Sequence, residues 1–369
     1  MTNTVFSPSF GNKPRILVGR NEEMSRFRDL LSSPSGSRDR ILILLGQRGM
    51  GKTVLLLELE QLAKKRGFVT TRPVVAASGM LDKIMEQIED NAKDILKPRK
   101  AHVSGGNIGA FGFSAGIQLR GDTEKAHTFS YHMANICREI NSLGKGVLFI
   151  IDEVQSLHPD LRELVITFQE LVGMGLNVAV VFAGLPRTVS ALLQSNVLTF
   201  LNRAPKDYLK PLRNADVSAF FKDSFTNMGV SIEKNLCDSA AASSMGSPYM
   251  MQLIGYYLEK EVSPGGSVNK VLFEKALGFA VDDFDNDICE AILKDLSDTD
   301  INTLLAISAL DSEEPSASQV IHAMGVSNAY YQQYKNRLAD AGILDTSRRG
   351  HVSFAVPYIR DYIRKTYMG

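Results

Sequence analysis

The hydrophobic residues in the first half of the chain form short, unbroken runs that alternate with helical patterns. Strands are predicted at Ile41–Leu45, Phe68–Ala76, Val147–Ile151 and Val178–Ala183. Helices are predicted between them at Thr53–Arg66, Met80–Leu96 and Asp160–Val172. Strands that do not alternate polar and apolar residues are buried on both faces. The pattern therefore predicts an α/β core, in which helices cover both faces of a parallel sheet.

Beyond Leu212 the strand signal nearly disappears. Helical patterns follow at Asp216–Phe225, Asn235–Ser244, Met250–Lys260, Val271–Ala280 and Asn286–Leu296. Three short helices come next, at Asp298–Leu310, Ala317–Met324 and Asn328–Ala341, followed by short strands at Ile343–Thr346 and His351–Val356. The predicted organisation is a flexible tail (1–14), the α/β core (15–212), an all-helical unit (213–295) and a winged helix-turn-helix (296–369).

One glycine-rich segment does not fit the core sheet. From Phe111 to Leu119 apolar residues alternate with small or polar ones, which is the period of a strand with one apolar face. We interpret residues 103–120 as a hairpin inserted in the core. It either contacts DNA or a partner, or packs its Phe111 and Phe113 face on the body, which is the interpretation we favour.

Charge and cysteine content narrow the class of protein. The chain has 369 residues, and its 41 basic residues balance 41 acidic ones, which excludes a polyanion-binding surface over the whole chain. The three cysteines lie far apart, as in proteins of a reducing cytosol. No apolar run approaches the ~20 residues of a membrane span, and no signal peptide is recognisable. We expect a cytoplasmic protein with no membrane partner.

The segment Gly46–Thr53 carries the strongest chemical signal, because it matches G-x-x-x-x-G-K-[ST] between a predicted strand and a predicted helix. Glycines allow a tight loop whose backbone N–H groups surround a phosphate at the helix N-terminus. Lys52 would bind the β- and γ-phosphates, and the Thr53 hydroxyl would be a ligand of Mg²⁺. The residues expected to bind ATP here are Gly46, Gln47, Arg48, Gly49, Met50, Gly51, Lys52, Thr53 and Val54.

Two adjacent carboxylates, Asp152 and Glu153, follow the apolar strand Val147–Ile151. Ligands of parallel sheets bind at the carboxyl ends of the strands, so both should lie at the phosphate site. Asp152 would hold the magnesium ion, directly or through water. Glu153 would act as the general base for the attacking water. An exposed acidic turn is the alternative, and the neighbouring phosphate loop disfavours it.

With these motifs the chain, from about Arg15 to Leu296, resembles the AAA+ and STAND branches of P-loop ATPases, and especially the origin-recognition-like ATPases of bacteria and archaea. The segment Ile16–Glu23 is similar to their V-G-R-x-x-E box. The resemblance implies a P-loop ATPase sheet, a helical lid over the nucleotide and a C-terminal winged helix. It also implies that Val18, Gly19 and Arg20 lie beside the adenine, although an ordinary turn would give the same sequence.

Several positions depart from the AAA+ pattern or carry a role only through the resemblance. Ala183 stands where a polar sensor is usual, and Arg187 is a candidate for that task. Arg203 is implied as an arginine finger, which would require self-association; a surface arginine is the alternative for both. Pro248, in a G-S-P sequence of the STAND type, is implied to pack near the nucleotide, and Tyr249 replaces the arginine that initiators usually carry.

The last domain has an uneven charge distribution. Residues 296–326 contain five acidic and no Lys or Arg residues, whereas residues 327–369 contain seven basic and three acidic ones. The stripe of Tyr330, Tyr331, Tyr334, Leu338 and Ala341 should face the core. Amides can read adenine edges, and basic side chains bind phosphates. The residues expected to contact double-stranded DNA are Gln332, Gln333, Lys335, Asn336, Arg337, Arg348 and Arg349.

The sequence therefore predicts an ATP- and Mg²⁺-dependent hydrolase that couples its nucleotide state to DNA binding through the winged helix. The alternative is a STAND-like switch, with slow hydrolysis, whose last domain recruits protein instead of DNA. A kinase of small molecules is disfavoured, because no small-substrate signature accompanies the phosphate loop.

Overall fold

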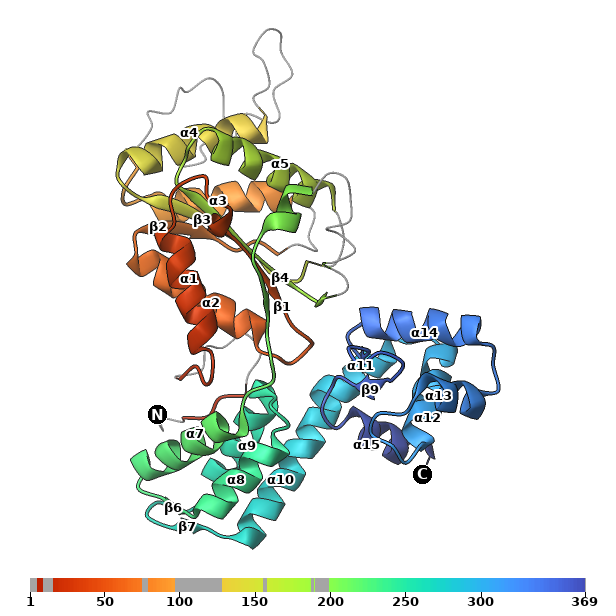
Figure 1. Ribbon diagram of the computed structural model, residues 1–369. Coiled ribbons are helices and arrows are strands. Elements are labelled where there is room, and N and C mark those ends of the chain that lie inside the picture. The colour runs from red at the N-terminus through yellow and green to blue at the C-terminus, as the bar shows by residue number, and fades with distance from the viewer. Residues whose placement is uncertain are drawn as a thin grey trace, which may run out of the picture.

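A computed structural model describes residues 5–8, 16–74, 79–96, 128–154, 158–186, 189 and 199–368. An α/β core, an all-helical unit and a C-terminal unit of residues 296–368 follow one another along the chain (Figure 1). The glycine-rich insertion predicted at 103–120 and the candidate Arg187 lie outside the described residues. No helix in the described ranges is long and apolar enough to cross a membrane.

The core sheet has five strands in the order β2-β3-β4-β1-β5, all parallel. They are β1 (Ile41–Leu45), β2 (Phe68–Thr71), β3 (Gly146–Ile151), β4 (Val178–Gly184) and β5 (Lys206–Tyr208). The parallel sheet is as predicted, but strand β2 ends five residues earlier than expected. Strand β5 was missed because its three residues, Lys-Asp-Tyr, contain no apolar run.

Helices pack on both faces of the sheet. Alternate residues of β1 show the division, because Leu42 and Leu44 point to one hydrophobic layer and Ile41 and Ile43 to the other. The first layer is completed by α1 (Asn21–Ser32) and α2 (Lys52–Lys65), and the second by α3 (Met80–Ala92), α4 (Phe129–Ser142) and α5 (Pro159–Gly173). The short helices η1 (Arg38–Arg40) and η2 (Thr199–Arg203) precede β1 and β5. This burial explains the apolar strands.

The all-helical unit, called the lid below, begins after β5. Its elements are α7 (Asn214–Asn227), β6 (Ser231–Ile232), α8 (Lys234–Ser243), α9 (Pro248–Glu261), β7 (Ser267–Val268) and α10 (Lys270–Phe284). Helix α10 continues through the π-helical turn η3 (Asp285–Glu290) into α11 (Ala291–Lys294). The sequence predicted two separate helices there. The continuous helix instead leads directly from the lid into the C-terminal unit (Figure 1).

The C-terminal unit has the predicted order of three helices and a two-stranded antiparallel pair. Its elements are α12 (Asp298–Ala309), α13 (Ala317–Met324), α14 (Asn328–Asp340), β8 (Leu344–Asp345), β9 (Ser353–Phe354), α15 (Ile359–Ile363) and η4 (Arg364–Met368). It shares one hydrophobic core with the lid. Tyr358 lies at the junction, where its ring packs on Phe284 and its hydroxyl donates to the Ser243 carbonyl at 2.6 Å. Lid and C-terminal unit are thus packed as one body.

The core-facing stripe of α14 is narrower than predicted. Tyr331 and Leu338 are fully buried, and Ala339 is also buried. Tyr330 is 40% exposed and packs its ring on Tyr334, with the ring centroids 4.8 Å apart. The prediction that Tyr330 faces the core is therefore wrong, because Ala339 lets the helix approach the core on its other side.

The N-terminal residues 5–8 pack on the lid. Phe6 is 1% exposed and belongs to the lid core. The prediction of a flexible tail is therefore wrong for residues 5–8, since burial of an aromatic ring fixes that part of the segment.

Candidate nucleotide-binding site

The loop between β1 and α2 has the backbone geometry of an anion cradle. Gly49 and Gly51 both adopt φ +76°, in the left-handed region that favours glycine. Gly51 caps α2, so the first N–H groups of that helix face the loop interior. The Lys52 ammonium folds back and donates to the carbonyls of Gly46 at 2.8 Å and Gln47 at 2.9 Å. The loop thus holds a cation beside a helix N-terminus.

Burial lowers the pKa of Lys52 to about 8. Asp152 and Glu153 act against this shift, whereas Arg48 adds to it. Desolvation disfavours the charged form of this ammonium, so an anion that binds beside it stabilises the charge. The electrostatics of the loop therefore favour a phosphate ligand.

Asp152 and Glu153 lie at the end of β3, beside the loop. Thr53 Oγ1 donates to Asp152 Oδ2 at 2.9 Å, and the Glu153 N–H donates to Asp152 Oδ1 at 2.9 Å. Glu153 has φ +53°, and the next residue, Val154, donates its N–H to the Ala183 carbonyl of β4. This strained turn holds the exposed Glu153 carboxylate at the edge of the site while Asp152 remains next to Thr53.

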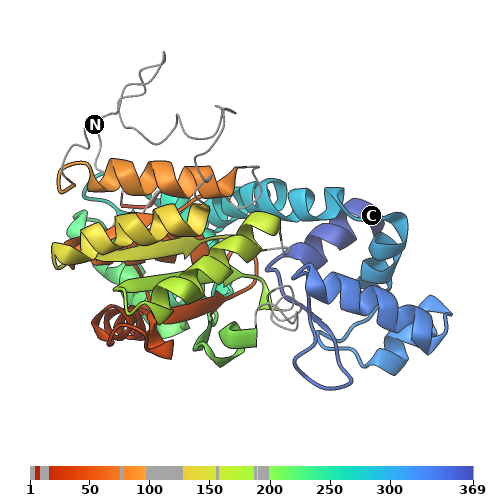
Figure 2. The same ribbon diagram turned by 90° about the horizontal axis from the view of Figure 1, so that it is seen from above.

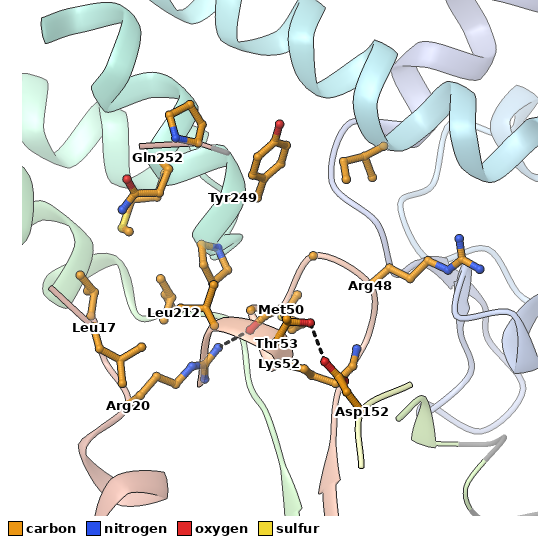
Figure 3. A pocket seen from close by; sticks show the side chains of 18 of the residues that line it. Leu17, Arg20, Arg48, Met50, Lys52, Thr53, Asp152, Leu212, Tyr249 and Gln252 are labelled. Carbon is orange, nitrogen blue, oxygen red and sulfur yellow. Dashed lines mark hydrogen bonds between the residues drawn. The ribbon is translucent and has the colours of Figure 1, made fainter. Parts of the chain in front are cut away.

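These groups open into a cavity of about 530 Å³ between the core and the lid (Figure 3). Its volume is in the range of pockets for nucleotide-sized ligands. The predicted site residues that line it are Val18, Arg20, Arg48, Gly49, Met50, Gly51, Lys52, Thr53, Val54, Asp152, Glu153 and Pro248. Residues that sequence reasoning missed include Ser7, Pro8, Ile16, Leu17, Tyr249, Met251, Gln252 and Ile288. Most of them belong to segments that only the fold brings to the core.

Four predicted residues do not line this cavity. Gly46 and Gln47 lie behind the loop interior, and Gly19 faces the lid, where a Cβ atom would be 3.2 Å from Leu212. Arg203 is exposed at the end of η2. The arginine-finger role of Arg203 stays a prediction, because such a residue would act on a neighbouring copy.

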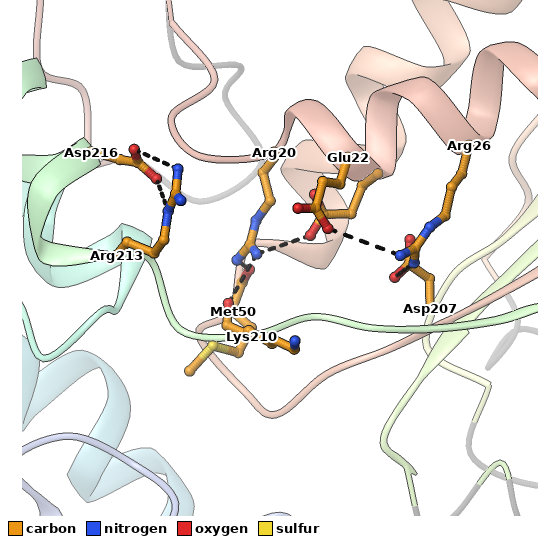
Figure 4. A network of polar contacts seen from close by, with 9 residues as sticks. Arg20, Glu22, Arg26, Met50, Asp207, Lys210, Arg213 and Asp216 are labelled. Carbon is orange, nitrogen blue, oxygen red and sulfur yellow. Dashed lines mark hydrogen bonds and ion pairs between the residues drawn. The ribbon is translucent and has the colours of Figure 1, made fainter.

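Arg20 holds together three segments around the site (Figure 4). It is 4% exposed, and it donates to the carbonyls of Met50 at 3.2 Å and Lys210 at 2.9 Å and to Glu23 at 3.2 Å. Burial lowers its pKa, and Glu23 opposes that shift. Arg20 thus ties the phosphate loop to the chain that leads into the lid. A paired Arg26 and Asp207 connect α1 to β5 beside it.

The residues present fit a nucleoside triphosphate with magnesium. Gly51 leaves only narrow space under the lid, because a Cβ atom there would lie 3.4 Å from Pro248. Thr53 and Asp152 supply the hydroxyl and carboxylate oxygens that Mg²⁺ prefers. Lys52 and the N-terminus of α2 supply positive charge for phosphates.

The C-terminal unit touches the back of the phosphate loop. Gly342, after α14, is buried with φ +73°, and a Cβ atom there would lie 2.7 Å from Gln47 Oε1 and 3.2 Å from Leu185. Gln47 Oε1 is buried with no hydrogen-bond partner within the described part of the chain. Leu185 follows strand β4 and lines the cavity. The contact places the C-terminal unit beside the core, as seen from above in Figure 2.

Two of the predicted DNA-contacting arginines are engaged in ion pairs. Arg337 pairs with the fully buried Asp300 at 2.9 Å, and Arg348 pairs with Glu314 at 2.6 Å. Arg349 is exposed at the hairpin tip. The remaining predicted residues, all on α14, are Gln332, Gln333, Lys335 and Asn336, of which Gln333 and Asn336 are exposed. The ion pairs arise from α12 and the α12–α13 loop, which the helix pattern of α14 did not reveal.

Comparisons with known proteins agree with this geometry. Residues 16–181 match the family described as AAA ATPase domain, and residues 286–363 match a domain of unknown function. No curated protein matches by sequence. The fold is similar to the Walker-type ATPase PABY2304 of Pyrococcus abyssi (15% identity, 95% of this chain and 97% of that one, TM-score 0.68). It is also similar to the Aeropyrum pernix ORC2 protein in ADPNP–ADP complexes (15% identity, 98% of each chain, TM-score 0.64).

Proposed function

We propose that this chain, whose residues 16–181 are an AAA ATPase domain of the P-loop type, binds and hydrolyses ATP. The observation that carries the proposal is the single cavity into which the phosphate loop, the Thr53–Asp152 pair and Glu153 all open. The similar A. pernix protein was solved with ADP and ADPNP. Its relation to this chain is one of fold, so the residues of the cavity are the main support.

Each residue has a definite task in this proposal. Lys52 exchanges its two carbonyl partners for phosphate oxygens, and Thr53 and Asp152 hold the magnesium ion. A bound Mg²⁺ supplies positive charge that neutralises the triphosphate. Glu153 accepts the proton of the attacking water. The exposed position of Arg203 outside the cavity is compatible with action on a neighbouring copy.

Self-association and hydrolysis are tested together by the ATPase rate as a function of protein concentration. If Arg203 acts on a neighbour, the specific rate rises with concentration and Arg203→Ala removes the rise. An arginine finger contributes about 10³–10⁵ in rate where it operates. A loss of activity in Arg203→Ala at concentrations where the protein is a proven monomer would contradict the role in trans.

We further propose that ATP changes how the C-terminal unit is presented. The support is physical continuity: the lid and the C-terminal unit share one core, and the C-terminal unit contacts Gln47 of the phosphate loop through Gly342. When phosphate displaces the Gln47 backbone carbonyl from Lys52, the loop readjusts. The contact between the Gln47 side chain and Gly342 then weakens. ATP then favours the state in which the lid closes on the core and the C-terminal unit, which is packed on the lid and moves with it, is released from the loop.

The proposed ligand of the released unit is double-stranded DNA, held by a winged helix. The exposed Gln333 and Asn336 on α14 and Arg349 at the hairpin tip support this proposal. DNA affinity is measured with and without ATP at fixed salt, and equal affinities would exclude the coupling. Neutralised phosphates also predict a steep loss of affinity as salt rises.

One observation favours the second candidate, a STAND-like switch that recruits protein. Arg337 and Arg348 are paired with carboxylates, and residues 296–369 carry seven basic against eight acidic side chains. The positive electrostatic potential of the C-terminal unit is therefore weaker than that of a strongly basic DNA-binding domain. The salt titration separates the two candidates, because absence of duplex binding at low salt favours the switch.

A further inference from the structure

An N-terminal strap, residues Val5–Ser7, is built into the lid. The Phe6 ring lies among three lid phenylalanines, with centroid distances of 5.4 Å to Phe220 and 5.6 Å to Phe221 and Phe225. Helix α9 makes room for it with Gly255, where a Cβ atom would lie 2.0 Å from the ring. No side chain larger than hydrogen fits there while Phe6 is in place. The lid is therefore shaped to receive this residue.

Polar contacts from the same face of α9 fix the backbone of the strap. The N–H groups of Val5 and Phe6 donate to Glu259 Oε2 at 3.2 and 3.3 Å. The Ser7 N–H donates to Gln252 Oε1 at 2.9 Å. Gln252 and Glu259 flank Gly255 at helical spacing, so one stripe of α9 binds the ring and three successive amides. The strap thus has a defined register.

The last of these bonds sets the orientation of Gln252. This side chain is 7% exposed and lines the cavity above Leu17 (Figure 3). Since its oxygen accepts from Ser7, its amide nitrogen carries the two donors that remain. Within the described ranges no hydrogen bond is donated by that nitrogen, so a donor group on the cavity wall is available to a ligand.

The position of Gln252 indicates which part of a ligand it meets. Lys52 and Thr53 mark the phosphate end of the cavity, whereas Gln252 and the apolar Met251 are on the lid helix α9, and the apolar Leu17 of the core lies below Gln252 in Figure 3. Apolar walls with an oriented donor are suited to a flat heteroaromatic ring that carries acceptor atoms.

We propose that Gln252 is a base-contacting residue that donates to an acceptor atom of the purine base, and that Phe6 is a positioning residue that acts through Ser7 and Gln252. This inference rests on the proposed nucleotide function. The N-terminal strap, whose Ser7 lines the cavity, thereby becomes part of the nucleotide site.

The test uses three variants of the full chain. Gly255→Ala fills the space of the Phe6 ring, and Gln252→Leu removes the donor. Gly278→Ala in α10 is the matched control, because nothing lies within 4 Å of a Cβ atom there. Amide exchange at Phe6 and Ser7, without nucleotide, reports whether the strap is docked. Affinities for MgATP and for magnesium tripolyphosphate, which lacks base and ribose, separate the two ends of the cavity.

We expect the Phe6 and Ser7 amides to be protected in the wild type and in Gly278→Ala, and to exchange at least about tenfold faster in Gly255→Ala. MgATP affinity should fall about 3- to 10-fold in Gly255→Ala and Gln252→Leu, as for the loss of one oriented hydrogen bond. Tripolyphosphate affinity should not change in any variant, a split that a merely structural defect of the lid would not produce.

Two results would overturn the inference while leaving the proposed function intact: unprotected strap amides in the wild type, or unchanged MgATP affinity in Gly255→Ala and Gln252→Leu. Equal losses for MgATP and tripolyphosphate would also overturn it, because they would locate the defect at the phosphate end. If the wild type bound neither ligand, the proposed function would fail and this inference with it.

Discussion

The contact between the C-terminal unit and the phosphate loop can be tested with one glycine. Gly342 has φ +73°, and a Cβ atom there would lie 2.7 Å from Gln47 Oε1. In Gly342→Ala the alanine must adopt a left-handed backbone, and the Gln47 amide must move to make room. The contact is thereby weakened without substituting any residue that lines the cavity, although the Leu185 side chain, 3.2 Å from the added Cβ atom, must also shift slightly.

The expected loss of unfolding free energy in Gly342→Ala has two parts, and substitution of a second glycine separates them. Gly325, after α13 in the same unit, has φ +64° with nothing within 4 Å of a Cβ atom. An L-residue in the left-handed region costs about 1–2 kcal/mol, so Gly325→Ala and Gly342→Ala should both lose about that much unfolding free energy. Gly342→Ala loses up to ~1 kcal/mol more, because the clashing atom is the mobile end of a side chain.

Nucleotide affinity is the decisive measurement. If ATP favours the released state, weakening the contact by up to ~1 kcal/mol should tighten MgATP binding about 2- to 5-fold in Gly342→Ala. Gly325→Ala should bind as the wild type does. In a Gln47→Ala background the partner is already absent, so Gly342→Ala should no longer change the affinity. Equal affinities of Gly342→Ala, Gly325→Ala and the wild type would refute the coupling.

Four further predictions each concern one side chain. Burial lowers the pKa of Lys52 to about 8, and a bound phosphate favours its ammonium form, so binding of MgATP at about pH 8.5 should be accompanied by proton uptake at Lys52. Calorimetry in buffers of different ionisation enthalpy measures this proton uptake. The variant Lys52→Arg should abolish the uptake. Glu153→Gln should keep MgATP affinity but slow single-turnover hydrolysis about 10²–10⁴-fold, and an unchanged rate would contradict its role as base. Arg337→Ala should lose about 1 kcal/mol of unfolding free energy, because it leaves the buried Asp300 carboxylate unpaired. Arg349→Ala should leave the melting temperature unchanged yet reduce the salt slope of DNA binding by about one, and equal behaviour of the two arginine variants would contradict this division.

The phosphate loop and the parallel sheet were predictable because their signals are local. A loop that needs φ near +76° at Gly49 and Gly51 requires glycine at those places, and a strand buried on both faces requires an apolar run. Asp152 was placed correctly beside Thr53 for a related reason. Parallel strands bring their carboxyl ends to one edge, so strand order hardly matters for such a pairing.

Other features depend on residues far apart in the chain. The sequence pattern could not show that Phe6 enters a space left by Gly255, or that Arg337 pairs with Asp300 instead of pointing to solvent. The helical spacing in α14 also predicted, wrongly, that Tyr330 faces the core. A helical pattern defines an apolar stripe, but it does not show which edge of that stripe a neighbouring element covers.

The loop motif between strand and helix and the order of the three units could be predicted from the sequence, because backbone conformation and hydrophobic period are properties of short segments. What closes the cavity and what touches the loop became visible only in the folded chain, because the strap, Gln252 and Gly342 come from three distant parts of the sequence. Their roles arise from complementary shape and from hydrogen bonds between distant segments, and such contacts leave no period or spacing in the sequence.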